Sequence, residues 1–173
     1  MESKAKIFGH AIHPILIVFP LGLLGTAAIF DALYLYSGNT TWSTVSFWML
    51  VSGIIGGLLA AVFGFIDFIN IPTGTRAKSI GLYHALVNVG AIILFALGLF
   101  LRWNTPTTPV MQATICSFAG LALALVGGWF GGELVERLGV GVSPNANLNA
   151  PNSLTHEKTY EIDARHQNLH PTR

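Results

Sequence analysis

Residues 12–36, IHPILIVFPLGLLGTAAIFDALYLY, form an apolar segment with one charged side chain, Asp31, and one histidine, His13. About 20 residues of α-helix cross a hydrocarbon core of about 30 Å, so this segment is long enough to span a membrane. It is also longer than the apolar core of a cleaved signal peptide, although Lys4 and Lys6 precede it as they would in such a peptide. We therefore expect a retained transmembrane helix.

Three further segments of the same kind follow, at about residues 45–69, 80–101 and 110–135. The polar stretches between them are short, and short loops join helices that run antiparallel. Helices of a soluble protein would need polar faces, which these segments lack. The sequence thus predicts an all-α fold: an integral-membrane, up-down four-helix bundle over residues 12–136, preceded by an N-terminal arm of residues 1–11.

The composition agrees with a membrane protein, because 52% of the residues are hydrophobic and only 10% are charged, against roughly 25% charged in an ordinary soluble domain. The lipid bilayer is therefore the first expected partner. A net charge of +1 is too small for a nucleic-acid partner. The single cysteine, Cys116, lies in an apolar segment, which excludes a disulfide framework and a thiolate metal site.

Basic residues predict the orientation, because Lys and Arg are retained on the cytoplasmic side of a membrane. In the predicted topology Arg102 stands alone on one side, and the other side carries Lys4, Lys6, Arg76, Lys78, Arg137, Lys158, Arg165 and Arg173. Both termini are then cytoplasmic. Residues 137–173 are polar and asparagine-rich, so we expect a mostly disordered cytoplasmic tail. Its histidines are too scattered for a metal site; they are His156, His166 and His170.

Glycines in the second and fourth segments predict close packing between helices, because small residues four apart let two backbones approach. These glycines are Gly53, Gly57, Gly127, Gly128, Gly131 and Gly132. The same pattern is also found at the interfaces of membrane-helix dimers. The sequence leaves internal packing and a homodimer interface open.

Titratable residues from all four segments gather at the predicted cytoplasmic side. His13 and His84 stand near the starts of the first and third segments, which both run outward, while Asp67 and Glu133 stand near the ends of the other two. His10 precedes His13 by one helical turn and shares its face if the helix reaches that far back. We expect these five side chains to lie at similar depth.

A second pair of charged residues lies at the opposite side. Asp31 follows His13, and Arg102 follows His84, at the same separation, roughly 27 Å along a helix that rises about 1.5 Å per residue. Asp31 and Arg102 therefore lie outside the histidine site, where they are candidates for an ion pair. The recurring order of a histidine, a charged residue and a carboxylate suggests a parallel internal duplication, in which His13 faces His84 across the bundle axis.

Two histidines that face each other inside a helical bundle are typical axial ligands of haem iron. The leading hypothesis is a b-type haem between His13 and His84 that passes electrons to a redox partner or a larger membrane complex. Asp67, Glu133 and Arg76 would tune the site or bind the haem propionates. The expected aromatic lining is Phe19, Phe63, Phe65, Phe68 and Tyr83.

Two other uses of the same residues stay open. With Asp67 and Glu133, the histidines could bind zinc or non-haem iron, because imidazole suits both metals. Carboxylates and histidines inside a membrane are also the usual parts of a proton relay.

A purely structural role competes with all of these hypotheses. Glu133 could pair with Arg137 one turn later, and Asp67 could meet Arg76 or Lys78 in the following loop. The protein would then be a membrane scaffold or assembly subunit without a cofactor. No nucleophile and base arrangement stands out, so nothing beyond electron transfer is indicated as an enzymatic activity.

Three stretches resemble the bacterial membrane-protein family called domain of unknown function 2231: GHAIHPILIVFPLG from Gly9, GFIDFINIPTGTRAKSIGLYH from Gly64, and GGELVERLGVGV from Gly131. The resemblance covers approximately residues 7–142 and implies a four-helix protein of the bacterial inner membrane. In some relatives this domain is fused to a Rieske-type iron-sulfur domain, which implies a redox function for the family. The family's pattern falls on His10, His13, Pro14, Asp67, Arg76, His84, Gly131, Gly132 and Glu133.

One position departs from that pattern, because Ala11 stands where the family usually has a proline, which loosens the turn before the first helix. The chain also contains neither a CxxCH motif nor a Rieske set of cysteine and histidine pairs. Covalently attached haem and an iron-sulfur cluster are therefore excluded in this chain.

Overall fold

The computed structural model describes residues 1–154; the rest of the predicted tail, with its three histidines, lies outside the described residues. The fold consists of α1 (Ile12–Ser37), α2 (Thr40–Ile69), α3 (Arg76–Leu101) and α4 (Met111–Gly132). A π-helix, η1 (Glu133–Arg137), continues α4, and a hairpin of β1 (Lys6–Ile7) and β2 (His10–Ala11) precedes α1. The four long helices are each apolar and long enough to cross a membrane, which confirms the predicted all-α membrane fold.

Helices α2 and α3 begin about one turn earlier than hydropathy alone predicts, because polar side chains cap them. The Asn39 side chain accepts a hydrogen bond from the backbone N–H of Thr41 at 3.0 Å. The Thr75 hydroxyl accepts one from the backbone N–H of Lys78 at 3.2 Å. Such caps satisfy N–H groups that the first turn of a helix leaves without partners, so both helices extend into stretches expected to be loops.

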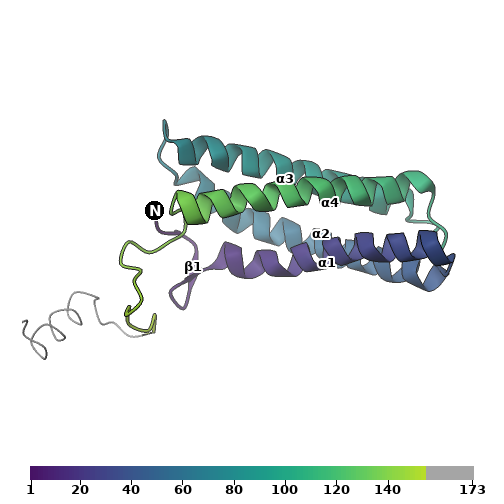
Figure 1. The fold of residues 1–173 in the computed structure, drawn as a ribbon, viewed down its shortest axis with the longest axis horizontal. Helices are drawn as coiled ribbons and strands as arrows, with labels where there is room; N and C mark the ends of the chain where they lie inside the picture. Colours follow the sequence, from purple (N-terminus) through teal and green to yellow (C-terminus); the bar gives the residue numbers. More distant parts are fainter. Residues whose placement is uncertain (155–173) are drawn as a thin grey trace, which may run out of the picture.

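The helices form an up-down bundle (Figure 1). Helix α1 packs along α2, α3 packs along α4, and the two hairpins meet through the α2–α3 and α1–α4 faces, so α1 and α3 stand at opposite corners. One end of the bundle holds the N-terminal arm, the α2–α3 loop and η1, and is called the histidine end below. The other holds the α1–α2 and α3–α4 loops, and is called the arginine end.

Buried residues of α1 recur 71 positions later on α3, and buried residues of α2 recur 67 positions later on α4, in agreement with the proposed internal duplication. On α1 and α3 the equivalent pairs are Pro20 and Ala91, Leu24 and Phe95, Ala27 and Gly98, and Asp31 and Arg102. On α2 and α4 they are Phe47 and Thr114, Gly53 and Gly120, and Ala60 and Gly127. This recurrence supports an internal duplication in which a pseudo-two-fold axis along the bundle relates the two hairpins.

The packing of equivalent glycines follows the same symmetry. A Cβ atom on Gly53 would lie 2.7 Å from Leu24 Cδ2, and one on Gly120 would lie 3.1 Å from the ring of Phe95. These two glycines thus let the helices of each hairpin approach closely. By contrast, Gly128 and Gly132 face open space, so internal packing explains only part of the glycine pattern.

The N-terminal arm folds back over the histidine end. The Ser3 hydroxyl lies 2.8 Å from both carboxylate oxygens of Asp67, and the backbone N–H of Gly141 donates to the backbone oxygen of Met1 at 2.7 Å. Gly141 belongs to the segment predicted to be a disordered tail. The first residues of that segment are instead paired with the arm.

Candidate functional site

His13 and His84 meet inside the bundle near the histidine end. Their ring centroids are 6.4 Å apart and the ring planes stand at 86° to each other. The two residues come from α1 and α3, which stand at opposite corners, so the rings reach toward each other across the bundle. Both side chains are partly buried. The prediction that His13 faces His84 is confirmed.

The hydrogen bonds of the two rings determine which nitrogen carries the proton. His13 Nδ1 lies 2.9 Å from the backbone oxygen of Ala60, and His84 Nδ1 lies 2.9 Å from that of Gly127. A carbonyl oxygen can only accept, so each Nδ1 carries a hydrogen and donates it. In the neutral imidazole, Nε2 then keeps its lone pair. In its neutral form the pair therefore offers two Nε2 lone pairs, one from each hairpin.

Glycines leave the space in which the rings lie. A Cβ atom on Gly64 would lie 2.8 Å from His13 Cε1, and one on Gly131 would lie 3.3 Å from His84 Cε1. Gly64 and Gly131 occupy equivalent positions of α2 and α4. Each imidazole is thus held by the backbone of the partner helix in its own hairpin, through one hydrogen bond and one close contact.

The two carboxylates expected at the site have other partners. Asp67 accepts hydrogen bonds from the Ser3 hydroxyl and from the backbone N–H of Lys4, the latter at 3.0 Å. Glu133 forms an ion pair with Arg76. The sequence left open an Asp67 pair with the following loop and a Glu133 pair with Arg137; among the described residues Asp67 instead bonds to the arm, and Glu133 pairs with Arg76. The fold brings the arm beside Asp67 and the start of α3 beside Glu133.

His10 does not share a helix face with His13, because α1 begins at Ile12 and His10 lies in β2 with an exposed side chain. Its Nδ1 lies 3.2 Å from the backbone oxygen of Phe8. Within residues 1–154, no three side chains of His, Cys, Asp or Glu are grouped closely enough to hold a metal ion. The structure thus does not assemble the zinc or non-haem iron site that the sequence left open.

The expected aromatic lining is largely absent. Phe19, Phe65 and Tyr83 point outward, each with more than half of its surface exposed. Phe68 packs against Gly81 and beneath the Lys78 ammonium group, whose nitrogen is 4.0 Å from the ring centroid. The sequence could not predict which way these aromatic side chains face, because the position of a residue along a helix does not determine how the helix is rotated about its axis.

One polar residue beside the histidines, Asn88, was not predicted from the sequence. Asn88 lies one turn after His84 on α3, and its amide nitrogen donates to the backbone oxygen of His84 at 2.7 Å. Its position could have indicated a site residue, because Asn88 lies in the middle of an apolar helix, one turn from a histidine. Polar groups within membranes are rare and usually functional.

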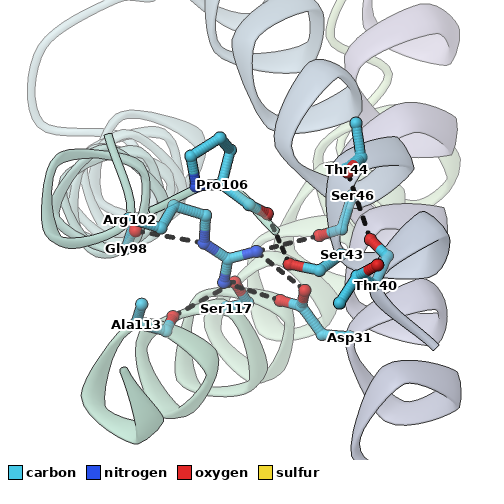
Figure 2. Close-up of polar contacts among 10 residues, drawn as sticks. All are labelled: Asp31, Thr40, Ser43, Thr44, Ser46, Gly98, Arg102, Pro106, Ala113 and Ser117. Atoms are coloured by element: carbon cyan, nitrogen blue, oxygen red, sulfur yellow. Dashed lines mark hydrogen bonds and ion pairs between the residues drawn. The ribbon is translucent and has the colours of Figure 1, made fainter. Parts of the chain in front are cut away.

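The arginine end contains a buried ion pair that joins all four helices (Figure 2). Arg102 caps the C-terminus of α3 and donates from Nη1 and Nη2 to the two carboxylate oxygens of Asp31, at 2.7 and 2.9 Å. It also donates to the hydroxyls of Ser46 on α2 and Ser117 on α4, both at 3.1 Å, and to the backbone oxygen of Gly98 at 3.3 Å. Both charged side chains are 0% exposed. The predicted pairing of Asp31 with Arg102 is confirmed.

An apolar cluster separates the two polar sites. Leu24, Leu50 and Phe95 are buried in one packed group, and along their helices they lie between the histidine pair and the Arg102 network. A proton relay across the membrane would need polar groups in this region. Among the described residues, the centre of the bundle thus favours two separate sites over one continuous path.

The fold and the site define a multi-pass membrane protein: an antiparallel four-helix bundle with a histidine pair near one end and a buried ion pair near the other. The family described as predicted membrane protein DUF2231 matches residues 9–144, so the chain belongs to this family, as its motifs indicated. No curated protein and no solved structure matches the chain.

Proposed function

We propose that this protein is a membrane-embedded redox protein in which His13 and His84 would hold a b-type haem. The observation that carries the proposal is the geometry of the pair. Two imidazoles from separate hairpins meet inside the bundle, and each gives its Nδ1 hydrogen to a backbone carbonyl. That hydrogen bond fixes the tautomer whose Nε2 can bind a metal, and it orients the ring as well.

The donor set fits a haem better than a metal ion held by protein alone. A haem iron needs only two axial ligands from the protein, because the macrocycle supplies the other four. A zinc site needs three or four protein ligands, and residues 1–154 contain no group of three. When bound, the haem would supply reversible one-electron transfer.

The surrounding residues have defined tasks in this proposal. Ala60 and Gly127 hold the ligand rings through their carbonyls, and Gly64 leaves room for the His13 ring. Arg76 is the candidate for binding the haem propionates, because only its Nη2 atom is engaged by Glu133 and its side chain is 59% exposed.

We also propose the bacterial inner membrane as the location, with both termini in the cytoplasm. The histidine end carries Lys4, Lys6, Arg76, Lys78 and Arg137, whereas Arg102 at the other end is buried in its ion pair. Lys and Arg mark the cytoplasmic side of membrane proteins. A redox partner would then meet the site from the cytoplasm, since the histidines lie near that end.

A scaffold without a cofactor is the second candidate, and one observation favours it. The same Nδ1 hydrogen bonds tie α1 to α2 and α3 to α4, so the histidines also contribute to packing. In that case their replacement would lower stability and change nothing else.

The two candidates differ in an absorption experiment on the detergent-purified protein. We expect His13→Ala and His84→Ala each to abolish the haem absorption bands, while His10→Ala, a matched change of an exposed histidine, keeps them. Circular dichroism verifies that each variant is folded. Haem bands that persist at full stoichiometry in a folded His84→Ala variant would refute the proposed ligation.

A further inference from the structure

The two histidines of the pair are not held in the same way, and Asn88 makes the difference. Its amide nitrogen lies 3.4 Å from Nδ1 and 3.5 Å from Nε2 of His84. An atom at those two distances in the plane of the ring would overlap Cε1, so the amide lies over the face of the imidazole. Asn88 cannot easily move away from this face, since its amide nitrogen also donates to the backbone oxygen of His84.

The ring of His84 is therefore restrained from three directions. The Gly127 oxygen accepts from Nδ1, the Cε1 edge faces Gly131 so closely that a Cβ there would lie 3.3 Å away, and Asn88 covers one face. The fit around Asn88 is tight, because a Cβ atom on Gly127 would lie 2.6 Å from both Oδ1 and Nδ2 of the amide. Rotation of the His84 ring about its Cβ–Cγ bond would drive it into the amide.

His13 lacks this third restraint. By the spacing that relates α1 to α3, the residue equivalent to Asn88 is Ile17, which has no hydrogen-bonding group. The carbonyl and glycine contacts are otherwise equivalent in the two hairpins. Asn88 is thus the polar group that breaks the pseudo-two-fold symmetry at the site.

We infer that Asn88 is a positioning residue that holds the ring of His84 nearly perpendicular to that of His13, a role that rests on the proposed haem ligation. The two ring planes stand at 86°. The angle between axial imidazole planes controls the splitting of the iron d orbitals in a ferric low-spin haem. Perpendicular rings give a strongly axial electron paramagnetic resonance (EPR) signal, and parallel rings give a rhombic one. The angle therefore has a spectroscopic signature that overall stability does not affect.

The test is EPR spectroscopy of the ferric protein, with two changes that remove or displace the amide and two matched controls. Asn88→Leu removes the amide at similar volume, and Ile17→Leu is its control at the equivalent position of α1. Gly127→Ala displaces the amide and leaves Asn88 in the chain, and Gly128→Ala is its control because that position faces open space.

We expect a strongly axial signal in the wild type and both controls, and its replacement by a rhombic or mixed signal in Asn88→Leu and Gly127→Ala. An unchanged axial signal in both of these variants would overturn the role of Asn88 and leave the haem proposal intact. A rhombic wild-type signal would overturn the perpendicular arrangement. A wild-type protein without haem would instead overturn the proposed function, together with the role that rests on it.

Discussion

Replacing Asp31 by leucine tests how strongly the buried ion pair stabilises the bundle. The change leaves the Arg102 guanidinium with two hydroxyls and one carbonyl, at a site where both charged side chains are 0% exposed. Arginine cannot lose its proton inside a protein, so the charge stays without a counter-ion. Removing one partner of a buried pair typically costs about 3–5 kcal/mol, and we expect Asp31→Leu to fall in that range.

The reverse change is expected to cost less. In Arg102→Met the remaining carboxylate can take up a proton and become neutral, which avoids a buried charge. The expected loss is then about 1–3 kcal/mol, the usual cost of an unsatisfied buried polar group. The double variant, Asp31→Leu with Arg102→Met, removes both charges, so its loss is expected to be smaller than the sum of the two single losses.

The assay is equilibrium unfolding in detergent, followed by the helical circular-dichroism signal, for the wild type, both single variants and the double variant. Ser52→Ala is the control, because Ser52 is exposed on α2 and its removal should change stability by less than about 0.5 kcal/mol. The reasoning is refuted if Asp31→Leu loses less than about 1 kcal/mol, or if the two single losses simply add in the double variant.

Two further changes test the histidine end. Gly64→Ala puts a Cβ atom 2.8 Å from the His13 ring, so we expect it to lower the haem content per folded chain. Gly132→Ala, at a position that faces open space, should leave the haem content unchanged. Equal haem content in both variants would contradict the close fit of the His13 ring against Gly64. Arg76→Ala breaks the ion pair in which Arg76 is 59% exposed and Glu133 is 18% exposed. We expect a cost of about 1 kcal/mol, the upper end for an exposed pair, in the same unfolding assay, and a loss above about 3 kcal/mol would show that the Glu133 carboxylate depends on Arg76 as a fully buried charge does.

The sequence predicted the parts of the fold that depend on hydropathy and on position along a helix. Four apolar segments gave four helices. His13 and His84 near the starts of two helices that run in the same direction were predicted to meet, and the equal separations from His13 to Asp31 and from His84 to Arg102 placed the second pair together at the other end. These predictions succeeded because α1 and α3 run in the same direction and repeat the same pattern. In two helices that run in the same direction, equal separations along the sequence give equal differences in depth.

Contacts that depend on helix rotation or on chain reversal could not be predicted in this way. The arm returns to Asp67 through Ser3, a contact between residues far apart in the chain that no local pattern encodes. Phe19 and Phe65 lie at the depth of the site but point outward. The early start of α2 depends on the cap at Asn39, which hydropathy does not register.

The measurement that tests the central claim most directly is a dithionite-reduced minus oxidised absorption spectrum of the wild-type protein, purified in detergent from haem-replete cells, with a pyridine haemochrome assay for stoichiometry. The histidine pair, in which both Nδ1 atoms are bonded to backbone carbonyls, predicts a Soret band that shifts on reduction and about one b-type haem per chain, since one iron takes two axial ligands. A folded, colourless protein would contradict the account and would leave the histidines as packing groups of a membrane scaffold.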